Sequence, residues 1–88
     1  MKLPISYQIL VELHNKCDIF YDEYINIKHI KFLSKDKSYL YKQLQDLQKI
    51  GLIKIIHEDN TSYIILTSTG EDIASSLKYV IEKINSLK

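Results

Sequence analysis

The sequence predicts a mainly α-helical (α+β) fold with a small β-hairpin, in a single domain that spans residues 1–88. Leucines repeat at helical spacing in "SYLYKQLQDLQKIGLIK", residues 38–54, until the pattern stops at Gly51. Two runs rich in β-branched residues follow, separated by the turn residues "EDNT". A long amphipathic stretch with helical spacing then follows from Thr69 to Leu87.

The first part of the chain predicts two helices. Pro4 stands where a first helical turn tolerates proline, and a helix is expected from there to about Lys16, with one apolar stripe formed by Ile5, Ile9 and Leu13. The stretch "DIFYDEYI", residues 18–25, has no clean period, so a loop, a short strand and a helical turn all stay open. Asn26 is a good cap for a short second helix that ends near Ser34, with an apolar face of Ile27, Ile30 and Leu33.

The third helix is expected to bury leucines on one side and to present a basic side to solvent. With Leu44 at the centre of the buried side, the far side carries Lys35, Ser38, Lys42, Gln45 and Lys49, and Tyr39 and Tyr41 lie on the flanks. The window from Lys28 to Lys49 contains six lysines and two aspartates, so its net charge is +4 in a chain of net charge +1. All twelve basic residues are lysine, so contacts that need the bidentate fork of arginine are not expected.

The second half predicts a hairpin followed by a helix that pairs with a second copy. Strands are expected at residues 52–57 and 62–68, and Thr69 begins the capping-box-like "TGED" of a last helix that runs to about Leu87. Its apolar residues alternate in steps of four and three, which is typical of a two-stranded coiled coil, and Ala74 and Ile81 widen the stripe. The spacing therefore predicts a homodimer whose interface comprises Ile73, Leu77, Val80, Ile81, Ile84 and Leu87.

Catalysis and metal binding have little support in the sequence. His14 and Cys17 could share a helix face as two metal ligands, but a site needs at least three. Asp22 and Glu23 are adjacent, so their side chains diverge in any regular segment and are poorly placed for paired acid and base catalysis. The chain has only two glycines, so a glycine-rich phosphate-binding loop is not expected. We therefore expect no enzymatic activity, no metal and no cofactor. A single cysteine, the lack of a membrane span and the lack of a signal sequence predict a cytoplasmic protein.

The order of helix, helix, helix, hairpin and helix resembles the winged helix-turn-helix family of DNA-binding regulators. "LYKQLQDLQKIGLI" is similar to the recognition helix that runs into the wing, and "LTSTGEDI" is similar to the motif that closes the wing in multiple-antibiotic-resistance-type regulators. The resemblance covers roughly Ile5 to Ile84, with the helix-turn-helix and wing at 4–68 and a dimerisation helix at 69–87. The composition, rich in isoleucine, lysine and tyrosine, looks like that of small archaeal and archaeal-virus members.

The resemblance implies sequence-specific binding of double-stranded DNA by a homodimeric transcriptional regulator. It places Ser38, Tyr39 and Lys42 toward the DNA groove, with Gln45 one turn further along. Gln45 is the candidate reader of adenine, and either tyrosine could contact a thymine methyl group or a phosphate. The full set of predicted DNA-binding residues is Lys35, Lys37, Ser38, Tyr39, Tyr41, Lys42 and Gln45.

The predicted wing departs from the family pattern, and a second function stays open. Glu58 and Asp59 stand near the wing tip where the family commonly carries arginine, so deep insertion into the minor groove is not expected. The alternative is a winged-helix module that holds a protein partner in a larger assembly and touches no nucleic acid. A basic third helix without acids on its outer side favours the DNA-binding reading.

Overall fold

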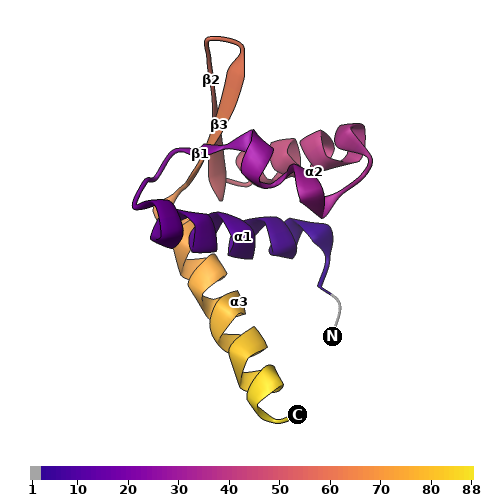
Figure 1. The fold of residues 1–88 in the computed structure, drawn as a ribbon, viewed down its shortest axis with the longest axis vertical. Helices are drawn as coiled ribbons and strands as arrows, with labels where there is room; N and C mark the ends of the chain where they lie inside the picture. Colours follow the sequence, from indigo (N-terminus) through magenta and orange to yellow (C-terminus); the bar gives the residue numbers. More distant parts are fainter. Residues whose placement is uncertain (1–2) are drawn as a thin grey trace.

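The computed structural model describes residues 3–88 and confirms the predicted class, mainly helical with a small hairpin (Figure 1). Its elements in chain order are α1 (Ile5–Phe20), β1 (Ile25–Asn26), the 3₁₀ turns η1 (Ile27–His29) and η2 (Lys31–Leu33), α2 (Lys37–Lys49), β2 (Ile53–Glu58), β3 (Thr61–Leu66) and α3 (Ser68–Ser86). The three strands form one antiparallel sheet in the order β1-β3-β2.

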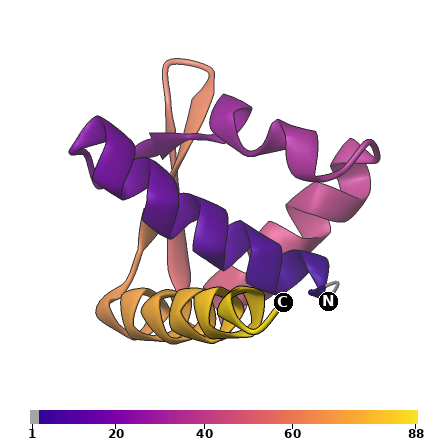
Figure 2. The same ribbon diagram turned by 60° about the horizontal axis from the view of Figure 1, so that its bottom comes forward.

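One apolar core joins these elements. Leu13 of α1, Leu44 of α2 and Ile64 of β3 are all completely buried within it. α1 lies between α2 and α3, and the end of α3 projects away from the rest of the molecule (Figures 1 and 2). The three leucines that the sequence assigned to the buried side of the third helix, Leu40, Leu44 and Leu47, are all buried.

The first helix is one turn longer than the sequence predicted. It continues to Phe20 instead of ending near Lys16, and Tyr21 ends it in the left-handed conformation with φ 53°. The undetermined segment 18–25 is therefore helical at its start. Its last residue, Ile25, begins β1 and pairs with Ile64 of β3.

The prediction of a second α-helix between Asn26 and Ser34 was wrong, because this segment forms two 3₁₀ turns. The amide of Ile30 donates to the carbonyl of Ile27, and the amide of Leu33 donates to that of Ile30. Asn26 caps the first turn as expected, and its side chain accepts from the amide of Lys28 at 3.0 Å. Asn26 also pairs with β3, so the chain leaves the sheet and turns at three residues per turn, which places Ile27 and Ile30 together in the core.

The hairpin is confirmed, with its boundaries shifted by one or two residues. Glu58 pairs with Thr61, and the intervening Asp59 and Asn60 have φ of 49° and 63°, as in a type I′ turn that matches strand twist. At the other end the helix begins at Ser68, which the sequence had assigned to the strand.

The cap of α3 is Thr67, and the prediction of Thr69 was wrong. The Thr67 hydroxyl accepts from the amide of Gly70 at 3.1 Å and donates to the carbonyl of Gly51 at 2.7 Å. The Thr67 amide donates to the carbonyl of Leu52 at 3.1 Å. A Cβ at Gly70 would lie 1.9 Å from the Leu52 oxygen, so only glycine allows this close approach of α3 to the start of β2.

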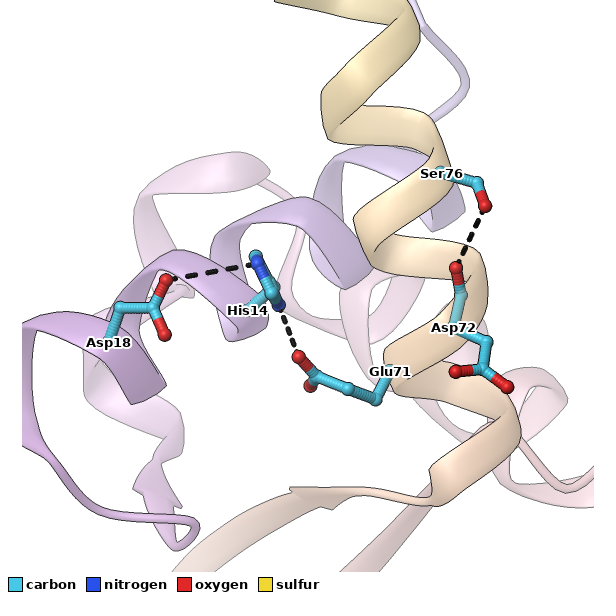
Figure 3. Close-up of polar contacts among 5 residues, drawn as sticks. All are labelled: His14, Asp18, Glu71, Asp72 and Ser76. Carbon is cyan, nitrogen blue, oxygen red and sulfur yellow. Dashed lines mark hydrogen bonds and ion pairs between the residues drawn. The ribbon is translucent and has the colours of Figure 1, made fainter.

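A polar contact also joins α3 to α1 (Figure 3). His14 Nδ1 lies 2.6 Å from Glu71 Oε1, and His14 Nε2 lies 3.8 Å from Asp18 Oδ2. Glu71 is in the first turn of α3, where a carboxylate also interacts favourably with the helix dipole. The beginning of α3 is thus held by Thr67 on one side and by His14 on the other.

Candidate nucleic-acid interface

The seven predicted DNA-binding residues all lie on the surface, on α2 or directly before it. We call this set the basic surface; it consists of Lys35, Lys37, Ser38, Tyr39, Tyr41, Lys42 and Gln45. α2 begins after Asp36, whose carboxylate accepts from the amide of Tyr39 at 3.1 Å. Ser34 orders the preceding loop through hydrogen bonds to the backbone of Asp36. The local sequence "SKDK" therefore fixes where the basic surface starts.

The lysines of this region are free to meet an external anion. Lys28, Lys31, Lys35, Lys37, Lys42 and Lys49 are all exposed. In residues 3–88 no carboxylate oxygen lies within 4.0 Å of any of the six, and the lysine ion pair found there joins Lys16 to Glu12 on α1. Asp46, the acid within α2, is exposed one helical turn after Lys42 and also lines a groove with Tyr7 and Ile73, but the exposed lysines around it outnumber it. The outer side of α2 is consequently positive.

The two tyrosines occupy different environments. Tyr39 is 47% exposed and lines a hollow with Leu33 and the beginning of α1, so part of its ring packs within the domain. Tyr41 is 37% exposed and lies on the flank of α2 nearer the hairpin, since Gln48, seven residues on, contacts β2. Tyr39 is therefore the more exposed of the two, and its ring borders the start of α1, whereas Tyr41 borders the hairpin side of α2.

Two residues that position α2 were not identified from the sequence. Asp36 caps the helix, and the signal was available because aspartate directly before a helical pattern is a common cap. Gln48 Oε1 accepts from the amide of Ile55 at 2.6 Å and so ties the last turn of α2 to β2. No sequence pattern predicts that bond, because it depends on how the hairpin packs against the end of α2.

The hairpin that follows α2 has a mixed polar surface. His57 Nδ1 and Ser62 Oγ lie 2.9 Å apart across the two strands, and Lys54 is exposed on β2. Glu58 and Asp59 are exposed at the turn. The acidic tip is thus at the place where a wing would approach DNA, which keeps the expectation that the wing does not insert deeply.

The predicted interface residues of α3 divide into two groups. Ile73, Val80 and Leu87 are exposed, at 37%, 47% and 81% respectively. Leu77, Ile81 and Ile84 are half-buried: Leu77 packs against the core, and the other two line a small hollow with Leu3. Ala74 is completely buried. The exposed group is the one available to a second copy.

The described residues also bear on metal binding, membrane insertion and thiol chemistry. Within residues 3–88 no group of three or more histidine, cysteine, aspartate or glutamate side chains is arranged to hold a metal ion. The helices described between residues 3 and 88 include none that is long and apolar enough to cross a membrane. Cys17 is partly buried against the core, and burial, followed by the carboxylates of Glu71 and Asp18, raises the pKa of its thiol to about 11.

Comparison with known proteins supports the fold. No family model matches the sequence, and no curated protein matches it either. Among solved structures the chain is similar to Sso10a-2, a DNA-binding protein from Sulfolobus solfataricus, with a TM-score of 0.70 and 15% identity over 98% of this chain and 85% of that one. It is also similar to SSV1 F-93, with a TM-score of 0.74 and 22% identity over 99% and 96% of the two chains.

A third similar structure is an archaeal protein, reported as a mechanosensitive channel and described as a structural homolog of MarR-like transcriptional regulators. Its TM-score is 0.70, with 22% identity over 91% of this chain and 66% of that one. These likenesses show that the chain has the winged helix-turn-helix fold. The predicted fold is thereby confirmed, with two 3₁₀ turns in place of the middle helix.

Proposed function

We propose that this chain binds double-stranded DNA as a homodimer and acts as a sequence-specific transcriptional regulator. The observation that carries the proposal is the basic surface, an exposed side of α2 whose lysines have no carboxylate oxygen within 4.0 Å in residues 3–88. An interaction module for a protein partner has no need for an excess of unpaired lysines on this side of the helix. The similar solved structures described as a DNA-binding protein and as a homolog of transcriptional regulators support the same reading.

The proposed contact places α2 in the major groove. A helix with its side chains is about 10–12 Å across, which suits the groove width of about 12 Å. Lys42, at the centre of the basic surface, then meets phosphates and releases their counterions. Gln45, one turn further along α2, is the residue placed to form paired hydrogen bonds with an adenine. Lys35 and Lys37, at the start of the helix, are placed for backbone phosphates.

Replacement of Lys42 tests the orientation of α2. In Lys42→Ala, we expect weaker binding to every duplex and a plot of log affinity against log salt that is flatter by about one unit. Lys16→Ala is the matched control because it removes the same charge from α1, outside the basic surface. Gel-shift titrations at two salt concentrations measure both effects. Equal affinity of wild type and Lys42→Ala for duplex DNA at low salt would contradict the placement of α2 in the groove.

Replacement of Gln45 tests sequence reading by the same helix. In Gln45→Ala, the preference at one base pair should weaken by roughly 1–3 kcal/mol, while the salt dependence should stay that of wild type. Selection of bound sequences from a random DNA pool, carried out for both proteins, shows whether a single position changes. If wild type selects no sequence and is not retained on heparin, the protein-binding alternative replaces this proposal.

A further inference from the structure

An apolar groove lies where α3 leaves the rest of the molecule. Its walls come from α1, from the end of α2 and from α3, and its volume is about 500 Å³. We call it the α3 groove; its main apolar lining residues are Tyr7, Leu10, Leu47, Ile50, Ile73 and Leu77. Ile50 is 68% exposed and Tyr7 is 44% exposed, so large apolar side chains stand uncovered on its rim. Exposed apolar surface of this kind is typical of an interaction site.

The groove is continuous with the exposed stripe of α3. Ile73, Val80 and Leu87 are separated by seven residues each, nearly two full helical turns, so they lie along one side of the helix. Ile73 belongs both to this stripe and to the groove. At the other end of the stripe Leu87 is 81% exposed. The three residues are therefore symmetric about Val80, with a groove at one end and an uncovered leucine at the other.

We propose that the α3 groove receives Leu87 of a second copy of this chain, with the two α3 helices antiparallel about a two-fold axis at Val80. Antiparallel pairing about Val80 places residue 73 of one copy opposite residue 87 of the other, in both directions at once. Each Leu87 then enters the groove of its partner beside Ile73. A parallel pair would instead stack Leu87 on Leu87 and leave both grooves empty. The inference rests on the homodimer of the proposed function.

The charges near the two ends are complementary. Asp46 is the one charged residue that lines the groove in the described part of the chain. Lys83 lies one helical turn before Leu87, and Lys88 follows it directly. When Leu87 of one copy enters the groove of the other, these two lysines approach Asp46. The same geometry brings the second copy against Leu47 and Ile50, so dimer formation supports the end of the helix that carries the basic surface.

Engineered cysteines test the antiparallel arrangement in a Cys17→Ala background. A mixture of Ile73→Cys and Leu87→Cys chains should form a mixed disulfide dimer, and Val80→Cys alone should form a symmetric one. Ile73→Cys alone and Leu87→Cys alone should not, because each cysteine would lie about 21 Å along the helix from its copy. Glu82→Cys, on the opposite side of α3, is the negative control. Efficient crosslinking of Leu87→Cys with itself would overturn the proposal.

A neutral substitution on the groove rim tests where Leu87 is seated. Ile50→Gln should raise the dimer dissociation constant at least tenfold, measured by sedimentation equilibrium. Ile19→Gln is the matched control, since Ile19 is 62% exposed on α1 and does not line the groove; its dimer should dissociate as wild type does. Circular dichroism shows whether each variant keeps its fold.

The outcomes separate this inference from the proposed function. A dimer that crosslinks through Val80 but is unaffected by Ile50→Gln would mean that Leu87 is not seated in the groove, and the proposal would fail while the homodimer stands. A wild type that is monomeric at tens of micromolar would overturn both this inference and the homodimer. The effect of Lys42→Ala on DNA binding would still decide the role of the basic surface in that case.

Discussion

Thr67 joins the hairpin to α3 through a single hydroxyl group. It accepts a hydrogen bond from the amide of Gly70 and donates one to the carbonyl of Gly51. Thr67→Val keeps the shape of the side chain and removes both bonds, so we expect the free energy of unfolding to fall by about 1–2 kcal/mol. Thr69→Val, at the exposed residue that the sequence suggested as the cap, should change it by less than about 0.5 kcal/mol. Urea titration of both variants decides between them, and equal effects would contradict the structural assignment.

Cys17 is the residue with a clear pH prediction. Burial and the neighbouring carboxylates raise the pKa of its thiol to about 11 from an ordinary value of 9.0. The thiol is therefore protonated at neutral pH, and iodoacetamide should modify it much more slowly than a cysteine in the urea-unfolded chain. Between pH 9 and 11 the unfolded thiol loses its proton before the folded one does, so this group's contribution to stability should be full below pH 9 and decline as pH rises. Modification at equal rates in both states would contradict the burial of Cys17.

At the scale of the element, the hydrogen bond from β2 to Gln48 fixes the last turn of α2, in addition to the burial of its leucines. The Gln48 side chain accepts from the amide of Ile55, so Gln48→Ala should lower the free energy of unfolding by about 0.5–1.5 kcal/mol. The exchange of the Ile55 amide hydrogen should also become faster, which NMR measures directly. Gln45→Ala, on the same helix but facing solvent, should leave both quantities unchanged. If Ile55 exchanges equally fast in all three proteins, this bond does not hold α2 to the hairpin.

The elements that the sequence predicted well are those with their own periodic pattern. The leucines of α2 repeat every three or four residues, and their burial follows from that spacing. The turn at Asp59 and Asn60 follows from residues that tolerate positive φ. The short strand β1 has two residues and no period, and it exists because Ile25 pairs with Ile64 nearly forty residues away. Contacts of that kind have no local signal.

The candidate site divides in the same way. The exposure of the lysines follows from helical geometry, since they lie opposite the buried leucines of α2. The partial packing of Tyr39 beside the start of α1 depends on the tertiary fold and was not predictable. The apolar stripe of α3 was predicted as one set of contacts, whereas the structure gives Leu77 largely to its own core and leaves Val80 and Leu87 in solvent. A spacing pattern identifies an apolar side of a helix, but not which molecule covers it.

At the scale of the whole molecule, α3 extends beyond the core at one end and the β2-β3 hairpin extends at the other (Figure 1). The described chain measures 45 × 27 × 23 Å, and α3 projects along its longest direction (Figure 1). Substitutions at the exposed residues of this helix test the dimer interface more cleanly than substitutions at the half-buried ones, because they leave the core intact. Replacement of Leu77 by a charged residue would disturb the core as well as any dimer, whereas Val80 and Leu87 are 47% and 81% exposed.

The double variant Val80→Glu with Leu87→Glu should therefore fold as a monomer and bind DNA much more weakly than wild type. The two carboxylates added at position 80 would face each other across the two-fold axis, and each carboxylate added at position 87 would enter the apolar groove of the partner beside Asp46, so both changes oppose association. Tyr79→Glu is the control, because Tyr79 is 66% exposed on a different side of α3. Light scattering measures the oligomeric state and circular dichroism measures the fold. A double variant that stays dimeric would place the interface on another surface.

The same two-fold axis predicts the form of the DNA target. Two copies of α2 related by a two-fold axis read the same sequence on opposite strands, so the selected sites should be approximate palindromes. The half-sites should be separated by one helical turn or a multiple of it, about 34 Å per turn, because both helices must reach the groove on one side of the duplex. Occupancy should rise steeply with protein concentration near the dimer dissociation constant. The Val80→Glu, Leu87→Glu monomer should lose both the steep rise and the preference for paired half-sites, while it retains preference for a single one through Gln45. Selection of asymmetric single sites by wild type would show that each copy binds alone.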